Sequence, residues 1–378
     1  MTKVILGTNE TSAWPHFGGS IWVRLQYMLG LERLGLEPYW VDRLGPPDVR
    51  RNPHSVDYLV DRFRQTADDF GFGTRWCIVF DGGRRHFGMD AGELEAVVGD
   101  AELLINISGH LPPGSPLERI PRRAYIDVDP GFTQIWAHQV DMGFARHNFF
   151  FTTGQNVDGP DFPIDLQGIC WQPTLPPVAL HAWPACSDDS CTRISTVADW
   201  RGSQDATYDG EWYGGKREEF LGFLRVPLEA ERQFELALLV GQADYEDLGI
   251  LLRHDWHVLD PYACAGDPHS YREFVQRSRA EFSVAKRGYV RTRSGWVSDR
   301  TACYLASGKP SIVQATGFAH RLPTGDGLLA FETVQEAVDA VRSVEAEYAR
   351  HAAAARRIAE DHFDSRRVLE SLLERVGL

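Results

Sequence analysis

Short apolar runs alternate with segments of helical spacing along the first half of the chain. Residues 3–7, 38–41, 76–80, 103–107, 124–128 and 148–152 are mostly apolar, as in parallel strands buried on both faces. Between the first two runs, residues 18–34 carry apolar Ile21, Leu25 and Met28 on a predicted helix that ends at Gly35. This alternation predicts a doubly wound α/β domain, in which ligands bind beyond the carboxyl ends of the strands.

The same alternation begins again in the second half. Residues 158–184 are rich in proline and lack a helical period, so they indicate a connection between domains. Strands are predicted at residues 194–199, 256–259, 282–285, 311–314 and 327–331, whereas residues 234–240 are apolar without a clear type. The predicted organisation is a first Rossmann-like domain over residues 1–165, a linker over 166–184, a second over 185–350, and terminal helices over 351–378 that could cross back.

One stretch of the second half combines positive charge with a helix start. After the strand at 282–285, Lys286, Arg287, Arg291 and Arg293 are predicted to form a cationic loop ahead of a helix over residues 296–305. Free N–H groups and a partial positive charge at a helix start favour an anion such as a diphosphate. The alternative is a basic loop that is only solvated.

Composition narrows the function classes. The 378 residues carry a net charge of -14, which argues against a protein that coats nucleic acid. The sequence holds no apolar run of about 18 residues, which predicts no membrane span, and its start shows no signal-peptide pattern, so we expect a cytoplasmic protein. Six cysteines are too few for a disulfide framework. Free thiols are therefore expected, with a disulfide or metal site at Cys186 and Cys191 as the alternative.

Several motifs resemble the GT-B superfamily of nucleotide-sugar glycosyltransferases. PHFGGSIWVRLQYMLGLERLGLEPYWV is similar to the glycine-rich helix start of its first domain, and SGWVSDRTACYLASGKPSIV resembles its donor-binding signature. GLLAFETVQEAVDAV resembles the strand and helix that follow. EFSVAKRGYV and YIDVDPGFTQIW look like a group of bacterial predicted glycosyltransferases. One branch of this superfamily, whose enzymes retain the anomeric configuration, carries a pair of glutamates. In this sequence the pair would fall near Gly295 and Cys303, and neither position is acidic.

The resemblance implies a fold with two Rossmann-like domains and a cleft between them. It also implies a donor site in the second domain and an acceptor site in the first. The donor-binding residues implied are Gly18, Gly19, Arg201, Lys216, Lys286, Arg293, Ser294, Gly295, Ser298, Asp299 and Arg300. Asp299 could instead be a first-turn acid that favours the helix dipole, and Arg300 could pair within the protein.

The expected chemistry is glycosyl transfer without a metal ion or other cofactor. A leaving diphosphate gathers negative charge, which arginine, lysine and backbone N–H groups can stabilise. Asp127 and Asp129 form an Asp-x-Asp pattern that offers a metal site as an alternative. An inverting enzyme also needs a base, for which His16, His110 and Asp129 are the candidates. Each has an ordinary alternative. Either histidine could lie on the surface or have its hydrogen bonds satisfied within the protein, and Asp129 could simply form a turn.

Three functions fit these features. The first is a glycosyltransferase with a nucleotide-sugar donor, a small-molecule or other acceptor, and no nucleic-acid partner. The second is a nucleotide-sugar 2-epimerase of the same fold, which would convert donor with no acceptor present. The third is a non-catalytic nucleotide-sugar-binding protein. The cationic stretch fits all three.

Overall fold

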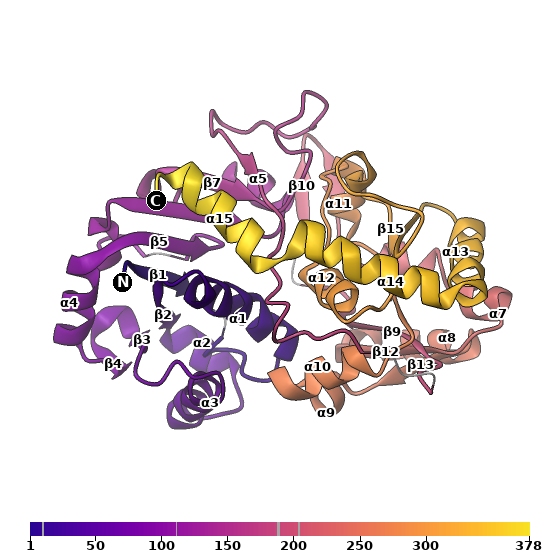
Figure 1. The fold of residues 1–378 in the computed structure, drawn as a ribbon, viewed down its shortest axis with the longest axis horizontal. Helices are drawn as coiled ribbons and strands as arrows, with labels where there is room; N and C mark the ends of the chain where they lie inside the picture. Colours follow the sequence, from indigo (N-terminus) through magenta and orange to yellow (C-terminus); the bar gives the residue numbers. More distant parts are fainter. Residues whose placement is uncertain (10, 111, 187–189, 203–204) are drawn as a thin grey trace.

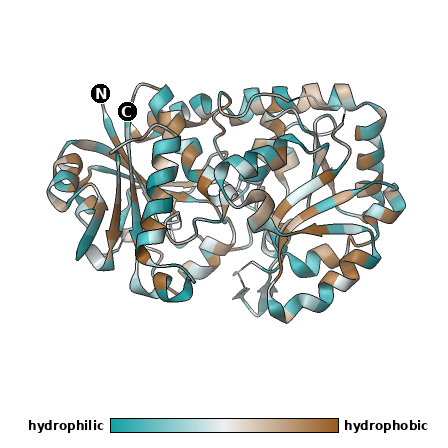
Figure 2. Ribbon diagram, turned by 90° about the horizontal axis from the view of Figure 1, so that it is seen from below, coloured by the Kyte–Doolittle hydropathy of each residue, from teal (hydrophilic) through white to brown (hydrophobic). Residues whose placement is uncertain are grey.

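The computed structural model describes all residues of the chain except 10, 111, 187–189 and 203–204. Two helix-flanked sheets lie side by side and form two domains (Figure 1). Hydrophobic residues lie along the strands inside each domain, and hydrophilic residues occupy much of the outer helical surface (Figure 2). This arrangement confirms the predicted fold class of two doubly wound α/β domains.

The first sheet has the strand order β4-β3-β2-β1-β5-β6-β7-β8 and is parallel except for the pairing of β4 with β3. Its strands are β1 (Lys3–Thr8), β2 (Glu37–Leu44), β3 (Trp76–Phe80), β4 (Arg85–Gly88), β5 (Ala101–Ile107), β6 (Arg122–Asp127), β7 (Phe149–Thr152) and β8 (Gln172–Pro173). Its helices are α1 (Gly18–Arg33), α2 (Pro46–Arg51), α3 (Val56–Asp69), α4 (Ala91–Asp100) and α5 (Phe132–Ala137).

The second sheet has the order β13-β12-β9-β14-β15-β16, and all of its pairs are parallel. Its strands are β9 (Ile194–Asp199), β12 (Phe234–Leu239), β13 (Trp256–Leu259), β14 (Ala280–Ser283), β15 (Ser311–Gln314) and β16 (Leu328–Phe331). A hairpin joins β10 (Ala206–Tyr208) to β11 (Glu211–Tyr213). The helices are α6 (Arg217–Leu221), α7 (Val226–Ala230), α8 (Tyr245–Arg253), α9 (Pro261–Ala265), α10 (Pro268–Gln276), α11 (Arg287–Thr292), α12 (Asp299–Ala306), α13 (Val334–Ala346) and α14 (Tyr348–Ile358).

The last helix returns to the first domain. After α14 and a wide turn over Ala359–Phe363, α15 (Ser365–Val376) packs on α1 (Figure 1, yellow). A Cβ on Gly30 of α1 would lie 2.8 Å from the Cβ of Ser365, so the two helices approach closely there. Arg375 also donates to the carbonyl of Pro173 at 2.9 Å. One hydrophobic core consequently runs through both domains, from Val4 to Val376.

Two local predictions differ from the structure, and one segment whose type the sequence left open is now assigned. The ambiguous residues 234–240 contain β12, and residues 172–173 of the predicted linker form the edge strand β8. The predicted cationic loop is wrong in part, because residues 287–292 form α11. The first N–H groups of α11, on Arg287 and Gly288, donate to the carbonyls of Gly215 and Gly214, and these contacts stabilise a helix that the local sequence alone does not indicate.

Candidate active site between the two sheets

The loops at the carboxyl ends of both sheets meet at the boundary between the domains. Strand order changes direction between β1 and β5 in the first sheet and between β9 and β14 in the second. Doubly wound sheets bind ligands at such points. Lys286, three residues after the end of β14, contacts Asp129, two residues after the end of β6 in the other sheet. The candidate site is therefore the boundary where these loops face each other.

Lys216 is the unusual cation of this site. It lies just before α6 with 8% of its surface exposed. Among the described residues, none accepts a hydrogen bond from its ammonium group or forms an ion pair with it. Burial lowers the pKa of Lys216 well below its usual value, and the nearby cations Arg300 and Lys286 lower it further, while the carboxylates of Glu281 and Asp199 raise it by less. An ammonium group in such surroundings is costly unless an anion joins it.

Arg300 is engaged within the protein. Its Nε donates to Glu281 at 2.8 Å and its Nη1 to the carbonyl of Val197 at 2.8 Å, while Nη2 donates to Ser283. Glu281 is fully buried, so the pair fixes α12 against the sheet. This arrangement corresponds to the alternative in which Arg300 pairs within the protein instead of with a ligand.

Arg201 and Arg293 differ from Lys216 in their surroundings. Arg201 donates two hydrogen bonds to Asp244, at 2.6 and 2.7 Å, and this pairing holds the pKa of Asp244 below its usual value. Arg293 is exposed and adopts a left-handed backbone with φ of 47°. Its carbonyl accepts a hydrogen bond from Asn156 at 2.8 Å. Their predicted contacts with a diphosphate stay predictions.

The start of α12 faces the first domain. The Ser294 carbonyl accepts a hydrogen bond from the Asn156 backbone at 3.0 Å, and Gly295, with φ of 75°, leaves no room for a Cβ beside the same loop. Ser298 caps α12 by accepting from the N–H of Arg300 at 3.2 Å. Asp299 is half-buried in the first turn, and burial raises the pKa of its carboxyl group. A narrow pocket beside this helix start is lined by Ser283, Ala285, Trp296, Val297, Ser298, Thr301, Val313, Gln314 and Phe318.

Gly18 and Gly19 lie where α1 meets the second domain. A Cβ on Gly18 would come within 2.4 Å of the carbonyl oxygen of Asp267, and one on Gly19 within 2.8 Å of the Tyr271 ring. Trp22 of the same helix donates to the carbonyl of Pro268 at 2.7 Å. The two glycines thus permit close contact between domains, a role the sequence did not indicate.

Asp127 and Asp129 have separate partners. Asp127 is fully buried and accepts hydrogen bonds from Thr133, Gln134 and Thr152 at 2.6 to 3.0 Å. Asp129 instead accepts from Lys286 at 3.0 Å and from the hydroxyl group of Tyr289. Throughout the described part of the chain, no group of three or more His, Cys, Asp or Glu side chains is placed to hold a metal ion.

The two candidate histidines lie in different loops of the first domain. His16 contacts the hydroxyl group of Tyr58 at 3.1 Å, and its ring lies 5.1 Å from that of His54 and 6.4 Å from that of Tyr262 in the second domain. Burial lowers the pKa of His16, and His54 adds to this. His110 is half-buried in the loop after β5, next to residue 111, which lies outside the described residues. Both remain predicted bases.

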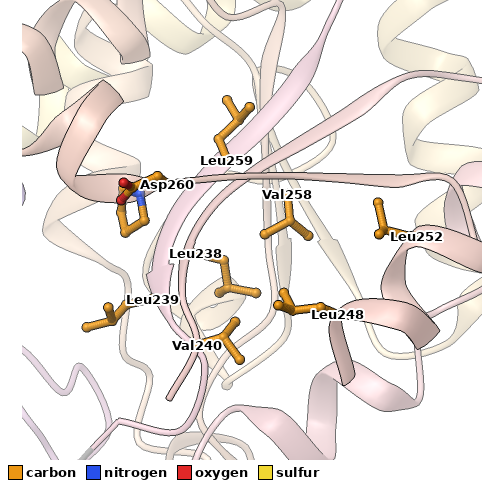
Figure 3. Close-up of a pocket in the computed structure, with 9 residues that line it drawn as sticks. Leu238, Leu239, Val240, Leu248, Leu252, Val258, Leu259 and Asp260 are labelled. Atoms are coloured by element: carbon orange, nitrogen blue, oxygen red, sulfur yellow. The ribbon is translucent and has the colours of Figure 1, made fainter. Parts of the chain in front are cut away.

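An apolar cavity of about 320 Å³ lies between α8 and the carboxyl ends of β12 and β13 (Figure 3). No residue of the predicted site lines it among the described positions. Asp260, a charged residue in the lining of this cavity, accepts a hydrogen bond from the N–H of Tyr262 at 2.9 Å and caps α9. The lining residues are Leu238, Leu239, Val240, Leu248, Leu252, Val258, Leu259, Asp260 and Pro261.

Sequence reasoning missed Tyr289 and Asn156. Tyr289 is buried, stacks on Trp296 at 4.2 Å and donates to Asp129. Asn156 joins the first domain to the loops around Arg293 and Gly317. Both donate hydrogen bonds to residues more than 130 positions away in the sequence. No local motif could have revealed them.

None of the six cysteines, all of which lie in the described part of the chain, forms a disulfide. Cys186 and Cys191 are thus not joined to each other, and residues 187–189 between them lie outside the described part. That the thiols stay reduced in the cell remains a prediction. No helix of that part is long and apolar enough to cross a membrane.

Comparison with known proteins finds one matching family and several solved structures of similar fold. Residues 235–374 match a protein family described as glycosyl transferase-like. No curated protein matches the chain in sequence. An alpha-glucosyltransferase in complex with UDP has a similar structure, with a TM-score of 0.62, 11% identity and 100% of each chain covered.

Two further structures are similar. AviGT4, a glycosyltransferase involved in avilamycin A biosynthesis, has a TM-score of 0.56 and 12% identity over 100% of this chain and 97% of its own. Anabaena Alr3699/HepE in complex with UDP has a TM-score of 0.55 and 10% identity over 100% of both chains. Some alpha-glucosyltransferase structures also hold DNA, so the expected lack of a nucleic-acid partner stays a prediction. At such identities the likeness shows the fold, which is the predicted GT-B fold.

Proposed function

We propose that this chain, a GT-B protein with a glycosyl transferase-like second domain, transfers a sugar from a nucleoside diphosphate sugar to an acceptor. In that reaction the bond between the anomeric carbon and the diphosphate oxygen breaks, and a bond from the acceptor to the same carbon forms. The acceptor proton passes to a base, and the nucleoside diphosphate leaves. The UDP held by two structures of similar fold supports a nucleotide donor.

The buried ammonium group of Lys216 carries this proposal. It lies close enough to Lys286 for the two charges to repel each other, and no described side chain forms an ion pair with it. A diphosphate between the two lysines would supply the missing negative charge. Charge-assisted hydrogen bonds to phosphate oxygens are also among the stronger contacts in proteins.

We propose further that the reaction needs no metal ion. The two carboxylates that could form an Asp-x-Asp site have other partners, since Asp127 accepts from three side chains and Asp129 accepts from Lys286 and Tyr289. Lys216, Lys286 and the start of α12 offer positive charge in place of a divalent cation.

A thermal-shift screen tests the donor site. The protein is heated with UDP, GDP, dTDP, ADP or CMP, each with and without EDTA. We expect one nucleoside diphosphate to raise the Tm in both conditions. No shift with any of them would contradict the donor site, and a shift abolished by EDTA would contradict metal independence.

Product analysis with the matching nucleotide-sugars tests the reaction. We expect sugar transfer only when an acceptor is present. Conversion of the donor to an epimer without acceptor would instead identify the 2-epimerase. Donor binding without any conversion, across a panel of acceptors, would favour the non-catalytic alternative.

A further inference from the structure

Lys286 joins the two domains through an ion pair. Its ammonium group lies 3.0 Å from Asp129 of the first domain, and both side chains are mostly buried, with 20% and 24% exposed. The same ammonium lies 5.5 Å from the centre of the Phe132 ring and 5.4 Å from that of Tyr289. Tyr289 donates to the same oxygen of Asp129. This contact therefore sits on the boundary between the domains.

The surrounding backbone holds this contact in place. Gly131 has φ of 91° and approaches Thr292, while a Cβ on Gly288 would lie 2.4 Å from the Phe132 ring. The segment after Asp129 and the helix after Lys286 thus pack directly on each other. The pair is well placed to respond to a ligand that enters between the domains.

Asp129 and a bound diphosphate would need the same ammonium group. Lys286 is close enough to Lys216 to lower the pKa of that residue, so an anion at Lys216 also lies within the field of Lys286. A diphosphate carries more negative charge than one carboxylate and offers several oxygens, so it competes well for the lysine.

We propose that donor binding transfers Lys286 from Asp129 to the diphosphate and thereby exposes Asp129 to the acceptor. This inference rests on the proposed function. Asp129 keeps its hydrogen bond from Tyr289 and becomes the group that accepts the acceptor proton. The donor consequently binds first, and the base is masked by its ion pair until the donor is in place.

The test uses UDP as the probe and a double-mutant cycle at Asp129 and Lys286. Calorimetry gives the Kd of UDP for the wild type, Asp129→Asn, Lys286→Met and the double variant. We expect Asp129→Asn to bind UDP about three- to tenfold more tightly, because Lys286 no longer has to leave a carboxylate. In the Lys286→Met background the same change should have no effect on the Kd.

Controls separate this mechanism from simpler ones. Asp158→Asn removes the carboxylate of another pair between the domains, Arg321–Asp158 at 3.3 Å, and should leave the Kd unchanged. Asp129→Ser, a second change at the same position, should repeat the gain if Asp129→Asn fails to fold. In a transfer assay, Asp129→Asn should lower kcat despite its tighter binding.

Two results would overturn the inference. An equal gain with and without Lys286 would mean that Asp129 merely repels the diphosphate. Unchanged or weaker UDP binding by the folded Asp129 variants would mean that the pair is structural. By contrast, a wild-type protein that binds no nucleoside diphosphate would contradict the proposed function itself.

Discussion

Replacing Lys216 with methionine should stabilise the ligand-free protein against unfolding and weaken its binding of nucleoside diphosphate. Lys216 is buried without a described acceptor, so its charge opposes folding. Methionine has an unbranched stem and carries no charge. Opposite effects on stability and binding are the mark of a residue kept for its ligand.

The size of both effects follows from the surroundings of Lys216. Removing a buried amine whose charged form is disfavoured should stabilise the fold by about 1–3 kcal/mol, which corresponds to a Tm rise of about 1–4 °C in a chain of this size. Losing one charge-assisted contact to a phosphate should cost about 1.5–3 kcal/mol of binding, which is an increase in Kd of about 10- to 150-fold.

Scanning calorimetry and titration of UDP measure the two quantities. Lys309→Met is the matched control, because Lys309 is a second buried lysine and has the Cys191 sulfur as a partner at 3.9 Å. That variant should leave the UDP affinity unchanged. A Lys216→Met protein that is less stable and binds UDP normally would refute the reasoning and make Lys216 a structural residue.

Four more outcomes are expected. Because burial lowers the pKa of Lys216 and a bound anion raises it again, UDP binding should take up protons, seen as a binding enthalpy that varies with the ionisation enthalpy of the buffer. Burial lowers the pKa of His147 to about 4 from 6.5, so the unfolded state binds more protons between these values and stability falls as the pH drops through this window. The loss between pH 7.5 and pH 5 should be about 2 kcal/mol in urea unfolding, and His147→Gln should flatten it. Gly30→Ala should destabilise the fold by about 1 kcal/mol, because its Cβ meets Ser365, whereas Gly99→Ala in α4 meets nothing and should be neutral or stabilising. With Asp129 as the base, His16→Ala and His110→Ala should both keep transfer and UDP affinity; a loss of transfer at unchanged UDP affinity in either variant would instead favour a histidine base.

The sequence predicted the architecture well because the strands of both sheets can be recognised from short segments of sequence. Each buried parallel strand is a continuous apolar run, and β1, β3 and β5 lie within two residues of their predicted bounds. Since ligands of such folds bind at strand ends, the neighbourhood of the site was also predictable. The helix predicted over residues 296–305 is present as α12, but it begins three residues later, at Asp299, with Ser298 as its N-cap.

Contacts over long sequence distances were beyond prediction. The partner of Lys286 lies 157 positions away and that of Asn156 lies 137 positions away. Which cations are neutralised within the protein depends on such partners. Arg201 and Arg300 read as ligand contacts in the sequence, yet each meets a carboxylate of its own domain. Lys216 differs because no described acidic side chain forms an ion pair with it, although Glu281 and Asp199 lie close enough to raise its pKa.

The return of α15 to the first domain has a consequence for how the chain is made. The surface of α1 that α15 covers belongs to a core shared by the first and last helices. During synthesis the first domain leaves the ribosome with that surface bare, and it stays bare until nearly the whole chain has followed. Domains usually fold in order from the amino terminus as they emerge. Here the first domain can only be completed late, so nascent chains should depend on chaperones that shield α1.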